Sequence, residues 1–290
     1  MRATALALVT LLLTAGCGQS VTGVPTPNPE AARQAAADVY STSVRAIEKY
    51  VDETRDFRGT IFFYAAVNER KSGSDVDVAM RGTPPALLTK SRSKTPPGYD
   101  YDIYHPSGDP LEYVRLGKAY TSIAPTEWVS MSASGTDLDC AIVGLQTLCK
   151  IVAALGATDK ASPPGRNTTG MRLPDGRTEL RTEITLKTVV DNQVINFPAD
   201  VVALIEPAMM NRLVAVNIVL NSDRTLLKAE VKGEVHGEKS KVQLEIGYDA
   251  KGPATPADFP AAPRPDQVTA LPAGNEAKTQ FWNRMGSIQK

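Results

Sequence analysis

The stretch TLLKAEVKGEVHGEKSKVQLEIGY, Thr225–Tyr248, contains two runs in which apolar and polar side chains alternate at every second position. Val231 and Leu244 belong to the apolar sets of the two runs, whereas Lys232 and Glu245 belong to the polar sets. Successive side chains of a β-strand point to opposite faces of a sheet, so this alternation produces one dry face and one wet face. The stretch therefore predicts neighbouring antiparallel strands in a sheet that is covered on one face only.

Further candidate strands all precede this stretch in the chain. Alternation continues in Leu213–Leu220 and Thr178–Val189, and an earlier group of predicted strands, separated by Gly and Pro turns, comprises Arg58–Val67, Ser74–Arg81, Tyr99–Tyr104, Glu112–Leu116, Ala119–Ile123 and Glu127–Met131. A long sheet twists and curls, and its dry face must be covered. We therefore expect an α+β fold: a single large curved antiparallel sheet, or half-barrel, with helices covering the concave apolar face.

The covering helices are predicted in four places. Asn28-Pro29-Glu30 combines a capping side chain, a proline in the first turn and an acidic residue, which is typical of a helix start. The predicted helical segments are Ala31–Thr54, the apolar patch Asp137–Leu155, Pro198–Met210 and Asn275–Ile288. Residues 252–272 are proline-rich and predicted to be extended. No internal repeat or second domain boundary is visible, so one large domain is expected.

The composition narrows the function classes. Acidic and basic residues balance at 32 each, which argues against a nucleic-acid-binding protein. With 42% hydrophobic and 22% charged residues, the chain has the composition of a folded domain. Two histidines and three cysteines leave little material for a metal cluster. We expect no catalytic centre, no metal and no cofactor.

The N-terminus has the features of an export signal over residues 1–16. Arg2 precedes a short apolar run, and Ala15-Gly16 stands directly before Cys17, which resembles a bacterial lipobox. That resemblance implies cleavage before Cys17, its lipidation (diacylglyceryl and palmitate-type acyl groups), and a tether over residues 17–28. The expected location is the extracytoplasmic face of the cell membrane. The alternative is an ordinary secretory signal in which the cysteine is incidental.

The remaining two cysteines, Cys140 and Cys149, form an even pair suited to an oxidising compartment. A straight helix would separate positions nine apart by about 13.5 Å, whereas a disulfide requires Cα atoms within about 6.8 Å. A bridge therefore requires a break in the helix, and Gly144 is the candidate position. The alternative is two buried thiols on one continuous helix.

Several short motifs together resemble a known family. These are the strand opening Phe57-Arg-Gly-Thr60, the segment Tyr113–Tyr120 followed by Trp128, and Gly247–Pro253 before the proline-rich tail. Over residues 30–272, the chain resembles the LolA/LolB-like fold and the actinobacterial lipoprotein family of LppX and LprG. The resemblance implies a LolA-like lipid-binding domain over 29–273, with a half-barrel and helices enclosing a cavity for acyl chains. Residues 274–290 form a C-terminal tail outside that pattern.

The aliphatic strand faces supply candidate lining residues for such a cavity. They are Ile61, Phe63, Val76, Val78, Val214, Val216, Val231 and Leu244. A carrier of acyl chains needs a dry and roomy groove, because exposing a long chain to water is costly. The same residues are equally suited to a filled core, and both interpretations stay open at this point.

Chemistry-bearing motifs are few. His105 and His236 each stand alone, so neither suggests a metal site. Ser91-Arg-Ser-Lys94 matches the Ser-x-x-Lys pattern of penicillin-recognising enzymes, but it lies in a predicted polar loop, where a solvated basic cluster of Lys90, Arg92 and Lys94 is the simpler interpretation.

The sequence therefore favours a non-enzymatic, membrane-anchored lipoprotein that binds or carries a lipid or glycolipid in the cell envelope. An envelope transporter is a candidate partner. The rival is a filled-core surface lipoprotein that acts as a protein-interaction or envelope-signalling module.

Overall fold

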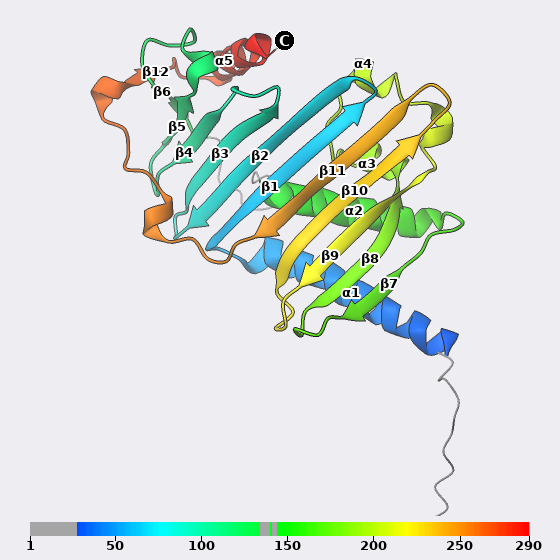
Figure 1. Ribbon diagram of the computed structural model, residues 1–290. Helices are drawn as coiled ribbons and strands as arrows, with labels where there is room; N and C mark the ends of the chain where they lie inside the picture. Colours follow the sequence, from blue (N-terminus) through cyan, green and yellow to red (C-terminus); the bar gives the residue numbers. More distant parts are fainter. Residues whose placement is uncertain (1–27, 134–139, 141–143, 290) are drawn as a thin grey trace, which may run out of the picture.

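The computed structural model describes residues 28–133, 140 and 144–289. Its strands form one sheet in the order β12-β6-β5-β4-β3-β2-β1-β11-β10-β9-β8-β7 (Figure 1). Neighbouring strands are antiparallel, except that β12 runs parallel to β6. The strands are β1 (Phe57–Val67), β2 (Arg70–Arg81), β3 (Ala86–Thr95), β4 (Tyr101–His105), β5 (Leu111–Leu116), β6 (Trp128–Ser132), β7 (Thr169–Arg172), β8 (Thr178–Thr185), β9 (Leu213–Leu220), β10 (Leu226–His236), β11 (Lys241–Ala250) and β12 (Val268–Ala270).

Helices gather on one face of this sheet, which we call the inner face; the opposite face is the outer face. The α-helices are α1 (Pro29–Glu53), α2 (Leu145–Ala161), α3 (Leu186–Asp191), α4 (Ala199–Val202) and α5 (Asn275–Ile288). Short 3-10 turns cover Lys118–Tyr120, Pro207–Met209, Pro256–Asp258 and Pro265–Gln267. The Asn28 side chain caps α1 by accepting a hydrogen bond from the Glu30 amide at 3.0 Å. The predicted fold class, an α+β half-barrel with helices on its apolar face, is confirmed.

The main core lies between the inner face and helices α1, α2 and α3, with α1 and α2 behind the sheet in Figure 1. The alternation in β10 and β11 sorts their side chains as expected: Val231 is fully buried, whereas the Lys232 side chain is 59% exposed. Val231 lies opposite Ile246, and Lys232 lies opposite Glu245. Each apolar side chain in these strands therefore adds to one continuous dry surface.

Gly59 and Tyr248 connect two of the motifs that carried the family resemblance. A Cβ atom on Gly59 would lie 2.3 Å from the Tyr248 ring, so only glycine lets that ring cross β1. The Tyr248 hydroxyl lies 2.9 Å from that of Tyr50 on α1, and the two rings pack at 5.7 Å. Burial raises the pKa of Tyr248, which keeps this hydroxyl protonated. The pair joins α1 to the centre of the sheet.

Several segments differ from the expectation. Residues 86–95, where a polar loop was predicted around Ser91, form β3, paired on both sides with β2 and β4. Conversely, the predicted strand Ala119–Ile123 is a 3-10 turn, and the predicted strand Thr178–Val189 ends at Thr185, whose side chain caps α3 by accepting from the Thr188 amide. Strand formation depends on neighbours at least as much as on intrinsic preference, so a lysine- and serine-rich run becomes a strand between two partners.

The disulfide pairs Cys140 with Cys149, with a Cα–Cα separation of 5.8 Å. The chain breaks at Gly144, whose φ of +109° favours glycine, and α2 begins directly after it at Leu145. Both the bridge and the break that it required are confirmed. The rest of the predicted helix start, residues 137–139 and 141–143, lies outside the described residues.

The C-terminal segment wraps around the β6 end of the sheet. On the outer face, Phe259 and Ala254 pack in a small cluster with Tyr104 and Trp128. The segment then adds β12 beside β6 and returns as α5 on the other face (Figure 1), where Phe281 and Met285 enter a second small cluster. The proline-rich segment therefore covers the outer face of this end, and the tail outside the family pattern, residues 274–290, covers its inner face through α5.

Candidate functional site

Seven of the eight predicted lining residues are part of the main core, and the eighth, Phe63, packs against it half-buried. Val78, Val214, Val216, Val231 and Leu244 are buried, each at most 3% exposed. Over these five residues, the inner face matches the filled-core alternative. Their role in lining a cavity stays a prediction.

Phe63 lies at the edge of this core and lines a pocket of about 330 Å³. The wall on the sheet side is made by Phe63 and Ala65 of β1 and by residues 70–72 of β2, and the other wall by the segment 195–201. Ile195, Phe197 and Val201 make that second wall mainly apolar. Small-molecule pockets in proteins span roughly 300–1,000 Å³. This pocket therefore has room for a slender apolar group, such as part of one acyl chain.

The second wall was not predicted as part of a site. The sequence contains only a short apolar run, Ile195-Asn-Phe197, before Pro198, where a helix was predicted to start. The structure places that start correctly, but α4 has a single turn, from Ala199 to Val202. No periodicity of such a short run distinguishes a pocket wall from a loop.

One ion pair connects the two walls of the pocket. Arg70 of β2 pairs with Asp200 of α4, and their side chains are 55% and 67% exposed. Exposed ion pairs contribute only about 0–1 kcal/mol. The α4 wall is therefore held weakly on this side.

A stronger connection holds the far end of the same wall. The Glu206 carboxylate accepts hydrogen bonds from the amides of Glu238, Lys239 and Ser240 at 3.1, 2.7 and 2.8 Å, and from the Ser240 hydroxyl at 2.9 Å. These bonds join the segment after α4 to the turn between β10 and β11. They lower the pKa of Glu206 to about 2, chiefly through the backbone bond from Lys239.

We expect Glu206→Gln to remove an acid-sensitive part of the stability. Since folding lowers the pKa of Glu206 below its ordinary value of 4.5, its contribution is present above about pH 4.5 and is lost as the pH falls towards 2. The melting temperature of the parent chain should exceed that of the variant at pH 6, and the difference should shrink below pH 4.5. A constant difference from pH 6 to pH 2.5 would contradict this assignment.

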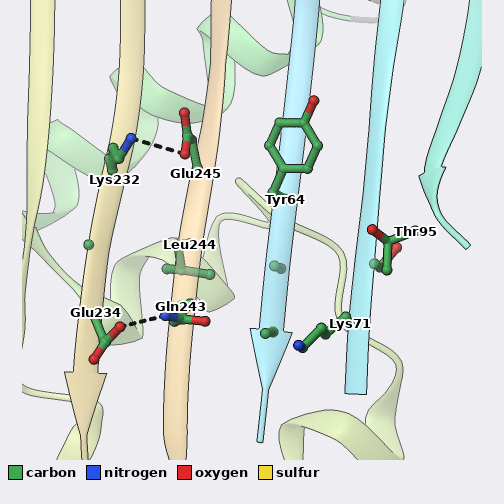
Figure 2. A pocket seen from close by; sticks show the side chains of 12 residues that line it. Tyr64, Lys71, Thr95, Lys232, Glu234, Gln243, Leu244 and Glu245 are labelled. Carbon is green, nitrogen blue, oxygen red and sulfur yellow. Dashed lines mark hydrogen bonds and ion pairs between the residues drawn. The ribbon is translucent and has the colours of Figure 1, made fainter. Parts of the chain in front are cut away.

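A wider trough of about 530 Å³ lies on the outer face across β10, β11, β1 and β2 (Figure 2). Four of its long polar side chains pair with one another: Lys232 with Glu245 at 3.0 Å, and Gln243 with Glu234 at 2.5 Å. Glu234 also pairs with Lys241 at 2.9 Å. Such paired charges are typical of a solvated sheet face.

The basic cluster and the Ser-x-x-Lys motif lie in β3. Ser91 is 8% exposed, whereas Lys94 points to the outer face and pairs with Asp75 at 3.3 Å. Residues three apart in a strand face opposite sides, so the lysine cannot activate the serine. Arg92 pairs with Asp102 at 2.6 Å, which makes the cluster part of the outer charge network.

The two histidines lie apart. His105 is buried, with Nδ1 3.2 Å from the Leu111 carbonyl, and His236 pairs with Glu234 at the end of β10. Within residues 28–133, 140 and 144–289, no group of three or more His, Cys, Asp or Glu side chains has the arrangement of a metal site. None of the described helices is long and apolar enough to cross a bilayer. Cys17, the predicted lipidation site, and residues 1–16 lie outside the described residues.

The fold and pocket define a class of protein: a half-barrel with helices on its inner face and an apolar pocket at one end of the core. No family model matches the sequence, and no curated protein matches it.

A comparison with solved structures found similar chains at low sequence identity, three of which follow. The Mycobacterium tuberculosis lipoprotein LppX is 13% identical, with a TM-score of 0.29, over 73% of this chain and 93% of that chain. A chain of the Pseudomonas aeruginosa MucA/MucB complex is 12% identical, with a TM-score of 0.28, over 78% of this chain and 61% of that chain. A LolA superfamily protein from Nitrosomonas europaea is 9% identical, with a TM-score of 0.25, over 75% and 95%.

Proposed function

We propose that this chain is a membrane-anchored lipoprotein that binds an acyl chain of a lipid or glycolipid in the pocket between β1–β2 and residues 195–201. The observation that carries the proposal is the apolar lining of that pocket by Phe63, Ile195, Phe197 and Val201. The hydrophobic effect supplies the driving force, about 0.8 kcal/mol for each CH₂ group that leaves water.

The position of the pocket supports exchange of a ligand. One wall is the single-turn helix α4 and its flanking loops, which an exposed ion pair holds on one side. Such segments open at lower free energy than the core behind them. In this proposal, a tether at Cys17 keeps the domain on the extracytoplasmic face of the cell membrane, and an envelope transporter is a candidate recipient of the lipid.

The test is uptake of a fluorescent fatty acid by the chain with Cys17 replaced to remove the anchor. Val201→Trp should fill the pocket and weaken saturable binding at least ten-fold. Leu204→Trp is the matched control, because Leu204 lies in the same segment, is 37% exposed and does not line the pocket. Its affinity should stay within two-fold of the parent chain.

Two results would count against the proposal in different ways. Equal binding by both tryptophan variants would place the ligand elsewhere. No saturable binding by the parent chain, and no lipid found with the purified protein by mass spectrometry, would remove lipid binding and favour the protein-interaction module.

A further inference from the structure

Helix α5 lies on the inner face of β4, β5 and β6 and packs one narrow apolar stripe of its own against these strands. Phe281 and Met285 are 3% and 2% exposed, and Trp282 and Ile288 pack beside them. These positions follow the spacing i, i+1, i+4 and i+7, the pattern by which an amphipathic helix enters a groove. Strand residues that form the floor are Val114, Leu116, Val129 and Met131, and Tyr101 packs against Trp282 with ring centroids 6.0 Å apart.

This contact is separate from the main core. The residues that α5 covers form a cluster of their own, distinct from the one beneath α1 and α2. Few polar bonds hold the helix: Arg284 donates to the Ser122 carbonyl at 3.3 Å, and Gln289 bonds the Tyr120 hydroxyl. The attachment therefore depends mainly on apolar packing, with Phe281 and Met285 inserted most deeply and Trp282 and Ile288 beside them.

The sequence of α5 gives it little stability of its own. Its N-cap is Gly274, which offers no side-chain capping bond, and its last turn contains no basic residue. Gly286 lies inside the helix, where glycine is unfavourable. Isolated helices shorter than about 12–15 residues are marginal in water, and α5 has 14 residues. Packing against the sheet therefore supplies most of its stability.

We propose that the inner face of β4–β6 is a helix-binding groove, which α5 occupies in cis and exchanges for an amphipathic helix of a partner protein with the same apolar spacing. A helix is the occupant to expect, because a helix with these anchors is seated there in this structure. The proposal is independent of the lipid pocket, which is built from β1, β2 and residues 195–201.

A fluorescein-labelled peptide of residues 275–289 is the probe, and its partner is the mature full-length chain with Cys17 replaced. Phe281→Ala with Met285→Ala in the chain should release α5 and leave the groove free, so the peptide should bind this variant at least ten-fold more tightly than the parent chain. A peptide that carries the same two alanines should not bind. Gln280→Lys with Asn283→Ser, on the exposed side of α5, is the matched chain control: it changes the helix propensity little and should behave like the parent.

A second variant stabilises α5 instead of releasing it, so its test does not depend on whether the alanine double variant folds. A Cβ atom on Gly286 would have no neighbour within 4 Å, so Gly286→Ala should stabilise α5 without strain. In a chain that carries only this substitution, the apparent dissociation constant of the peptide should rise about five-fold. The reason is that the fraction of molecules with α5 undocked falls by the same factor, which corresponds to about 1 kcal/mol. Gly156→Ala in α2, which is equally unobstructed, should leave it unchanged.

Hydrogen exchange supplies the decisive readout. Amides of residues 276–288 should exchange about five-fold more slowly in Gly286→Ala, and saturating peptide should protect amides of β5 and β6 in the alanine double variant. Failure of the peptide to bind a folded double variant would overturn the proposal. If that variant does not fold, absence of any Gly286→Ala effect on peptide binding and exchange would overturn it. Binding of a fluorescent fatty acid to the released groove with no peptide binding would also overturn it, in favour of a lipid occupant.

Discussion

Val231→Asp is expected to unfold the domain or to lower its free energy of unfolding by more than about 4 kcal/mol. Val231 is fully buried in β10 and belongs to the main core. A carboxylate at this position would lose its hydration without gaining a partner, and uncompensated buried charges are among the most destabilising changes known. Urea denaturation followed by circular dichroism measures the loss.

The adjacent residue provides the control. Lys232→Ala removes an exposed ion pair to Glu245 and should cost no more than about 1 kcal/mol. This contrast also separates the two interpretations of the inner face. If Val231→Asp changed the stability as little as Lys232→Ala does, water would have access to the inner face at Val231, and the packed core described here would be wrong.

Removing the disulfide is expected to have the second-largest effect on stability. Replacing Cys140 and Cys149 with serine opens a short loop, and the chain-entropy relation assigns such a loop roughly 2–3 kcal/mol. The loss should appear as a lower midpoint of urea denaturation. The bridge is attached to the first turns of α2, which supplies the fully buried Leu145, Leu148 and Ile151 to the main core. The bridge holds the start of that helix.

A reductant distinguishes the bridge from a packing effect of the cysteines. Dithiothreitol should lower the midpoint of the parent chain to near that of the serine double variant and leave the double variant unchanged. A parent chain that is insensitive to dithiothreitol under denaturing titration would favour two free thiols, the alternative that the sequence left open.

The pocket and the α5 groove occupy different strands, so their variants can be combined. Val201→Trp should leave peptide binding to the groove unchanged, and Phe281→Ala with Met285→Ala should leave fatty-acid uptake unchanged. Substitutions whose side chains share no partners generally act independently. Coupling between the two would indicate that the main core transmits a change from one end of the sheet to the other.

Residue patterns predicted much of this architecture, because the information is local. Strict alternation in Leu213–Leu220, Thr225–Val235 and Lys241–Tyr248 identified three neighbouring strands and their dry face, since a side chain in a strand can point in only two directions. A capping residue with a proline located the start of α1, and the spacing of Cys140 and Cys149 required the break at Gly144. Each of these inferences depended on a few consecutive residues.

What the tertiary structure added depends on residues that are distant in the chain. β3 is a strand because β2 and β4 flank it, and the pocket exists because residues 195–201 come to lie against the ends of β1 and β2. Alternation identified the dry face, but whether that face is filled or hollow depends on how closely α1, α2 and α3 approach it. That separation is set by packing across the whole core, which no local pattern encodes.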